Sequence, residues 1–221
     1  KKNYISLAKK SANIQINELK KIKKTFNNSF TNAVELILNC KGKIIFAGIG
    51  KSGLIARKIS ATFSSVGIPS FFCDPAQALH GDMGQIEKKD ILIIFSYSGN
   101  TSELNNMLKY ANRFRIKIIG VASKPDSILL KASDVKLILP KVREADLTGM
   151  VPTSSTSITL LFGDCLATSV MSIKRFSKEK FKVFHPGGNI GKSLLLAKDI
   201  MVTGKKIPTI SYKKRLREEW G

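Results

Sequence analysis

The chain has 221 residues and 43% hydrophobic composition, which suits one well-packed domain with an appendage rather than two full domains. Its longest apolar runs, such as Ile91 to Phe95, fall far short of the about 20 residues that a membrane span requires, so we expect a soluble protein without a membrane partner. The formal charge of +21 comes mostly from lysines scattered along the chain, whereas a specific nucleic-acid binder typically has a clustered, arginine-rich face. We therefore expect no specific nucleic-acid partner, and the charge favours attraction of small anionic substrates.

The sequence predicts two helices at the N-terminus, followed by a regular alternation of strands and helices. Residues 3 to 39 form two predicted helices, because apolar side chains recur there at helical spacing. Short β-rich runs follow at Lys43–Ala47, Ser70–Cys73, Ile91–Phe95, Lys117–Ala122 and Val135–Leu139. Segments of helical character lie between them, notably Ser52–Val66 and Ser102–Phe114. This alternation of strands and helices predicts an α/β fold, a doubly wound five-stranded parallel sheet with extra N-terminal helices.

The last predicted strand leads into a different kind of segment. Lys141–Pro152 is an irregular charged loop, and Ser154–Phe176 is a predicted long helix with apolar residues on one stripe. A turn rich in glycine and proline, His185–Gly191, then redirects the chain into a short predicted helical segment.

The cysteines and the N-terminus bear on the cellular compartment. Cys40, Cys73 and Cys165 are odd in number and widely spaced, which favours buried reduced thiols over a disulfide framework or a zinc site. The first residues show no apolar core and no small-residue cleavage site of a secretory signal. We therefore expect a cytoplasmic protein.

The first predicted strand runs into a glycine-rich loop, Gly48-Ile49-Gly50-Lys51-Ser52-Gly53, with the pattern G-x-G-x-x-G. Glycines there let the backbone approach a ligand, and the following helix offers N–H groups and a positive dipole end to an anion. Asp74 follows about 20 residues later, where a dinucleotide-binding fold has its ribose-binding acid. A nicotinamide-dependent enzyme is therefore one alternative.

The third predicted strand ends in Ser96-Tyr97-Ser98-Gly99-Asn100-Thr101 before a helix begins. Three hydroxyl groups at a helix N-terminus suit one compact phosphate, whereas ordinary capping of a helix needs only one. With a flavodoxin-like strand order, the loops after the first and third strands flank the switch point of the sheet. Both loops then face one crevice.

The Ser96–Thr101 pattern resembles the SIS (sugar isomerase) domain, in which these Ser and Thr positions hold a sugar phosphate. Within that superfamily the chain resembles the D-arabinose 5-phosphate isomerases, over about residues 5 to 210. The resemblance is carried by Gly50-Lys51-Ser52-Gly53, Leu79-His80-Gly81-Asp82, Arg143-Glu144-Ala145, Pro152-Thr153-Ser154-Ser155-Thr156 and His185-Pro186-Gly187-Gly188.

The resemblance implies a division into three parts. N-terminal helices over 1–40 pack on the core or on a partner subunit, and a flavodoxin-like SIS domain occupies 41–197. Residues 198–221 resemble the beginning of the tandem CBS domains that usually follow in this family. Because the chain ends at Gly221, we expect no CBS-mediated regulation. SIS domains usually associate, so we expect a homo-oligomer, a dimer or a tetramer.

The implied reaction interconverts D-ribulose 5-phosphate and D-arabinose 5-phosphate through an enediol and feeds Kdo and lipopolysaccharide biosynthesis. Such a reaction needs a base at carbon, a proton shuttle and positive charge near the oxyanion, and it requires no metal or other cofactor. The alternatives are an isomerase of another sugar phosphate, a non-catalytic SIS domain that senses a sugar phosphate, and the dinucleotide-binding enzyme. A sensor that regulates transcription would need a DNA-binding module, and residues 1–40 show no convincing helix-turn-helix.

The resemblance also implies the site residues. The expected catalytic residues are Glu144, His185, Glu103, Lys51 and His80. The expected substrate-binding residues are Gly50, Ser52, Ser96, Ser98, Asn100, Thr101, Thr153 and Ser154.

Each expected catalytic residue has a role in this reaction and several have a structural alternative. Glu144 is the predicted carbon base, with a surface ion pair to Arg143 or Lys141 as its alternative. Lys51 neutralises the enediolate or the phosphate. His185 and His80 are predicted to move protons between oxygens, to open the furanose ring or to hold hydroxyls. Glu103 either takes part in catalysis or stabilises its helix dipole.

Overall fold

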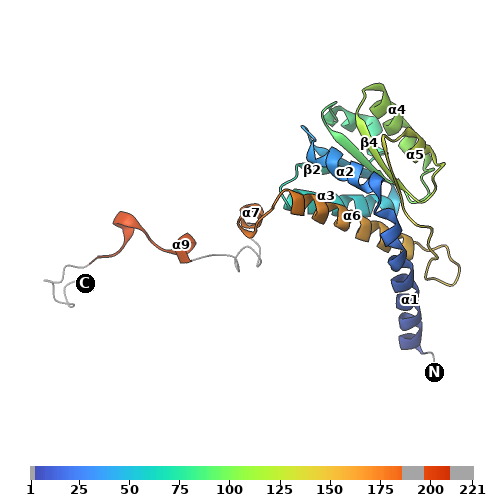
Figure 1. The fold of residues 1–221 in the computed structure, drawn as a ribbon, viewed down its shortest axis with the longest axis horizontal. Helices are drawn as coiled ribbons and strands as arrows, with labels where there is room; N and C mark the ends of the chain where they lie inside the picture. Colours follow the sequence, from blue (N-terminus) through green and yellow to red (C-terminus); the bar gives the residue numbers. More distant parts are fainter. Residues whose placement is uncertain (1–2, 186–196, 210–221) are drawn as a thin grey trace.

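A parallel sheet forms the centre of the molecule in residues 3–185 and 197–209, which the computed structural model describes (Figure 1). Within those residues its five strands are β1 (Ile44–Gly48), β2 (Ser70–Cys73), β3 (Ile91–Phe95), β4 (Lys117–Ala122) and β5 (Val135–Ile138). The strand order is β2-β1-β3-β4-β5 and every neighbouring pair is parallel. The predicted doubly wound α/β fold is therefore confirmed.

Helices cover both faces of the sheet. On one face lie α2 (Asn28–Leu38), α3 (Gly50–Ser65) and α6 (Ser154–Ile173), and on the other lie α4 (Asn105–Arg113) and α5 (Ile128–Ala132) (Figure 1). Successive strand residues point to opposite faces, so Ile44 and Phe46 pack in one core cluster while Ile45 and Ala47 pack in the other. Burial on both faces explains why these strands are continuous apolar runs rather than alternating ones.

The two N-terminal α-helices differ in how many of their side chains are buried. The first helix, α1 (Tyr4–Leu19), has none of its 16 residues buried, and its N-terminal end projects beyond the sheet (Figure 1). A 3₁₀ segment, η1 (Lys20–Thr25), joins it to α2, which buries Ala33, Val34 and Ile37. Asparagine residues cap the N-terminal ends of α1 and α2. The side chains of Asn3 and Asn27 accept hydrogen bonds from N–H groups in the first turns of these helices.

Helix α6 is, within the described residues, the one helix long and apolar enough to cross a membrane by length and composition alone. Its position in the fold accounts for that composition. One stripe, including Ile158, Phe162 and Leu166, is buried in the core cluster, and the helix packs against α3, α1 and α2. It is a core helix of the sheet domain.

The chain beyond α6 is described in part. Helix α7 (Lys178–Phe184) follows, and later come α9 (Ala197–Ile200) and the 3₁₀ segment η5 (Gly204–Lys206). Most of the predicted turn at 185–191 lies outside the described residues, as does the end of the third predicted part, from 210 onward. The three-part division of the chain stays a prediction.

A close contact between α3 and α6 fixes the distance between these helices. A Cβ atom added at Gly163 of α6 would overlap the side chain of Ile59, which is fully buried on α3. The missing side chain at Gly163 therefore lets the two helices approach, and their N-terminal ends border the cavity described below.

We expect Gly163→Ala to destabilise the protein by about 1 to 3 kcal/mol, because overpacking outweighs the about 1 kcal/mol that alanine gains in a helix. Urea unfolding followed by circular dichroism measures this change. Gly84→Ala is the matched control, since an added Cβ there meets nothing within 4 Å. Adding Ile59→Ala to Gly163→Ala should recover part of the loss relative to the sum of the single variants. A Gly163→Ala protein more stable than the parent would refute this account.

Candidate active site

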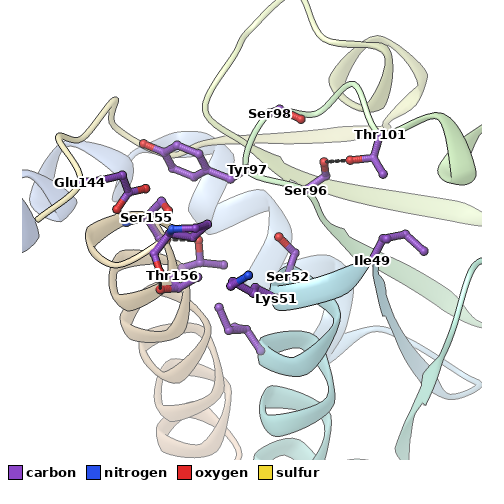
Figure 2. A pocket seen from close by; sticks show the side chains of 13 residues that line it. Ile49, Lys51, Ser52, Ser96, Tyr97, Ser98, Thr101, Glu144, Ser155 and Thr156 are labelled. Atoms are coloured by element: carbon purple, nitrogen blue, oxygen red, sulfur yellow. Dashed lines mark hydrogen bonds between the residues drawn. The ribbon is translucent and has the colours of Figure 1, made fainter. Parts of the chain in front are cut away.

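A cavity of about 360 Å³ opens at the carboxyl edge of the sheet, where β1 and β3 end (Figure 2). Three parts of the chain surround it: the start of α3 after β1, the loop after β3, and the loop after β5 with the start of α6. These parts contribute Ile49, Lys51, Ser52 and Ile55; Ser96, Tyr97, Ser98 and Thr101; and Glu144, Pro152, Ser155, Thr156 and Thr159.

The sheet topology places the cavity there. Gly48 of β1 pairs in register with Phe95 of β3, so the loops that follow these strands start side by side. The chain leaves β1 through α3 on one face of the sheet and leaves β3 through α4 on the other. The two loops therefore separate and leave a crevice at the switch point between them.

The loop Ser96–Thr101 is held in shape by its own hydroxyl groups. Ser96 is only 4% exposed, and its Oγ lies 2.8 Å from Thr101 Oγ1 and accepts a hydrogen bond from the Gly99 N–H at 3.1 Å. Gly99 has φ +69°, and a side chain at this position would overlap Ser127. Ser98 and Thr101 border the cavity, and Figure 2 shows the hydrogen bond between Ser96 and Thr101 that holds this loop.

Asn100 has a different role in this loop from the one expected. Its Oδ1 accepts a hydrogen bond of 3.0 Å from the N–H of Ile128, at the start of α5. This contact anchors the loop to the neighbouring helix, and Asn100 does not line the cavity that the described residues form.

The glycine-rich loop packs closely against the sheet. A Cβ at Gly53 would overlap the carbonyl oxygen of Gly48, and Gly50 has φ +57° at the first position of α3. Isoleucine at the N-cap, Ile49, has no polar side-chain atom to satisfy the first-turn N–H groups of α3. The Ile49 side chain therefore does not cap the first-turn N–H groups of α3. These groups and the positive end of the helix dipole lie beside the cavity.

Gly50 itself borders a second cavity, of about 490 Å³, on the β2 side of α3. Asp74 lies there, and its Oδ1 accepts a hydrogen bond of 2.9 Å from the Ala76 N–H. Arg57 lies over the ring of Phe72, 4.4 Å from its centroid. This second cavity is where the dinucleotide alternative would place a ribose.

Glu144 reaches the first cavity from the loop after β5 and binds the beginning of α6. Its Oε2 accepts hydrogen bonds from Thr153 N at 2.8 Å, Thr153 Oγ1 at 2.9 Å and Ser155 N at 3.3 Å. Burial raises the pKa of Glu144, but hydrogen bonds from Ser155 and Thr153 outweigh it and leave the pKa below its usual value. The side chain is therefore a carboxylate at neutral pH. No ion pair with Arg143 or Lys141 is found in the described part of the chain.

The start of α6 presents other residues to the cavity than those expected. Thr153 holds Glu144, and Ser154 is fully buried with its Oγ unpaired among the described residues. The positions that line the cavity instead are Pro152, Ser155, Thr156 and Thr159. Ser155, Thr156 and Thr159 share one face of α6, so helical periodicity is the signal that would have found these three, and Pro152 precedes the helix.

Lys51 and Ser52 lie at the cavity on the first turn of α3, and the Lys51 amine points into the space between α3 and α6 (Figure 2). Tyr97 also lines the cavity, although only its serine neighbours were expected there. Across the described residues, no three His, Cys, Asp or Glu side chains are grouped so that they could hold a metal ion.

Three of the expected catalytic residues do not line the cavity that the described residues form. Glu103 is exposed in η4 (Ser102–Leu104), and a hydrogen bond from Ser102 lowers its pKa. His80 is exposed in η2 (Gln77–His80), after β2. His185, at the end of α7, stacks on Phe181 with ring centroids 3.8 Å apart, and its Nδ1 lies 2.9 Å from the Phe181 carbonyl oxygen.

Comparisons with known proteins agree with the motifs. The family model described as SIS domain matches residues 37–169. The arabinose 5-phosphate isomerase KdsD of Escherichia coli (strain K12) is 42% identical over 193 residues, covering 87% of this chain and 59% of that protein. KdsD of Yersinia pestis is 40% identical over 217 residues, covering 98% of this chain and 66% of that protein.

A solved structure agrees as well. The structure of the c3406 protein of E. coli CFT073, in complex with arabinose 5-phosphate, superposes with a TM-score of 0.81 at 33% identity, covering 84% of this chain and all of that one. The chain spans between 59% and 66% of the length of the two curated relatives above. The family model and the relatives both cover more than half of the chain, and the chain belongs to the SIS domain family.

Proposed function

We propose that this chain is an aldose–ketose isomerase that interconverts D-ribulose 5-phosphate and D-arabinose 5-phosphate. The observation that carries the proposal is that one cavity combines a hydroxyl-lined loop at a helix start, the Lys51 ammonium and the Glu144 carboxylate. Relatives named arabinose 5-phosphate isomerase, at 40% to 42% identity, support the choice of substrate. The same resemblance supports Kdo biosynthesis as the destination of the product.

The phosphate of the substrate binds at the Ser96–Thr101 loop in this proposal. Ser98 and Thr101 border the cavity, and Ser96 fixes the loop beneath them. The uncapped start of α3 lies across the crevice, so a phosphate here meets hydroxyl donors and a helix dipole together. Lys51 adds the positive charge that either the phosphate or the enediolate oxygen requires.

Replacement of both Ser98 and Thr101 by Ala should weaken binding of ribulose 5-phosphate by about 1 to 3 kcal/mol, because hydrogen bonds to a charged group are lost. Isothermal titration calorimetry measures the affinity. Replacement of Ser102 by Ala is the control, since its hydroxyl bonds to Glu103 outside the cavity. If the folded double variant binds ribulose 5-phosphate with parental affinity, the phosphate does not bind at this loop.

Glu144 is the proposed carbon base. It removes the proton from C1 of the ketose or C2 of the aldose, which leaves an enediolate. The protonated carboxyl exchanges its proton with solvent and then delivers a proton to the neighbouring carbon. Its low pKa keeps it ionised and ready to accept a proton at neutral pH. The hydrogen bonds from Thr153 and Ser155 fix the orientation of the carboxylate, which proton transfer from carbon requires.

Replacement of Glu144 by Gln should lower the isomerisation rate by about 10² to 10⁴, because a positioned base is lost while its size and much of its hydrogen bonding remain. Exchange of the C1 or C2 proton with deuterated solvent, followed by NMR, measures the step itself. Calorimetry with ribulose 5-phosphate is the control and should give nearly parental affinity. If the glutamine variant exchanges the C1 or C2 proton at the parental rate, Glu144 is not the base, and another group such as Glu103 or His185 has that role.

The histidines favour a site shared between subunits. His80 and His185 lie outside the cavity of their own chain, so a second subunit is a direct way to bring an imidazole to the substrate. Helix α1 supports association, because Tyr4, Ile5 and Leu7 are between 59% and 71% exposed. We therefore propose a homo-oligomer, a dimer or a tetramer.

Mixed oligomers test this proposal. His80→Ala and Glu144→Gln chains should each be inactive alone but partly active after unfolding and refolding together, because a mixed pair restores one complete site. A mixture of His185→Ala with Glu144→Gln repeats the test for the other histidine. Sedimentation velocity confirms that mixed oligomers form. If they form and neither mixture regains activity, the sites are not shared in this way.

A cytoplasmic location is part of the same proposal. All three cysteines are free thiols, and burial is the main cause that raises the pKa of each, to about 11 for Cys73. Unpaired cysteines that resist ionisation suit a reducing compartment.

A further inference from the structure

The segment that carries Glu144 is long and irregular, yet it is held firmly. It runs from the end of β5 at Ile138 to the start of α6 at Ser154 without a helix or strand. A loop of this length has a high conformational entropy, so the position of Glu144 depends on contacts that other elements make with its backbone.

The side chain of Tyr97 makes two of these contacts. Its hydroxyl accepts a hydrogen bond of 2.9 Å from the Val142 N–H and donates one of 3.0 Å to the Pro140 carbonyl. Burial raises the pKa of Tyr97, so the hydroxyl keeps the proton that it donates to Pro140. Its ring packs against the same core cluster as Val142.

Two other side chains fix the neighbouring residues. The Arg143 N–H donates to Oε2 of Glu18, on α1, at 3.1 Å. The Ala145 N–H donates to Thr153 Oγ1 at 2.8 Å. The backbone N–H groups on both sides of Glu144 are therefore held by side chains, one from α1 and one from the residue before α6.

Of these holding side chains, Tyr97 belongs to the proposed phosphate loop. It lies between Ser96 and Ser98 and lines the cavity itself (Figure 2). Its carbonyl oxygen accepts hydrogen bonds from the N–H and the Oγ of Ser123, at 2.8 and 2.7 Å, which ties the loop to the end of β4. The side chain of Tyr97 therefore connects the Ser96–Thr101 loop to the backbone of Val142, two residues before Glu144.

We propose that Tyr97 is a positioning residue that couples the phosphate loop to Glu144. It acts through the backbone of residues 140–142 and not on the reacting atoms. Its effect on turnover rests on the proposed isomerase function, whereas its effect on the order of the loop does not. Misplacement of a reacting group by about 1 Å can cost 10²-fold in rate, so loss of one hydroxyl is expected to lower kcat by roughly 10- to 100-fold.

The test compares Tyr97→Phe with Tyr110→Phe. The second tyrosine is also half-buried and its hydroxyl also bonds to a carbonyl, that of Ile86 at 3.5 Å, but it lies on α4 away from the cavity. Three quantities are measured: kcat and KM with ribulose 5-phosphate, the Kd for inorganic phosphate by calorimetry, and hydrogen exchange of a peptide covering residues 140–146 by mass spectrometry.

For Tyr97→Phe we expect kcat to fall roughly 10- to 100-fold, with KM and the phosphate Kd within about twofold of the parent and faster exchange in 140–146. Tyr110→Phe should match the parent in all three. Parental kcat and exchange in Tyr97→Phe would overturn the inference, as would an equal loss of turnover and phosphate affinity. If the parent itself does not isomerise, the proposed function fails, and the exchange rate of 140–146 alone decides whether Tyr97 positions the loop.

Discussion

The parallel pairing of β1 with β3 is the constraint on which the rest of the structure depends. It places Gly48 beside Phe95, so that the two loops that border the cavity leave the sheet together. The crossovers then diverge to opposite faces, because α3 packs in one core cluster and α4 in the other. The crevice between the two loops is a consequence of this divergence.

Within the cavity, the helix starts have separate tasks. The start of α6 binds the Glu144 carboxylate through the N–H groups of Thr153 and Ser155. The start of α3 has no side-chain cap and lies across from the hydroxyls of Ser98 and Thr101. One positive helix end thus holds a negatively charged protein group, and the other has no side-chain cap and lies where the proposed phosphate would bind. With the proposed phosphate bound, the separation of the phosphate from the Glu144 carboxylate would limit their mutual repulsion.

The sequence predicted the fold more completely than the site. Strand positions agree within one residue, because strands buried on both faces are short apolar runs between polar turns. Thr153 and Ser154 were expected at the cavity, but Ser155 and Thr156 line it, since the rotation of a helix about its axis depends on its packing. The contacts of Tyr97 were not predictable, because its partners are backbone atoms some 40 residues away that any sequence would supply.

The central claim is that this cavity isomerises a pentose phosphate by moving a proton between adjacent carbons. Incubation of the protein with ribulose 5-phosphate in deuterated water, followed by NMR identification of the aldose, tests it most directly. The account predicts D-arabinose 5-phosphate carrying deuterium at C2, formed without NAD. Absence of any aldose product, with binding of NAD at the loop Gly48–Gly53 in place of the sugar phosphate, would contradict it.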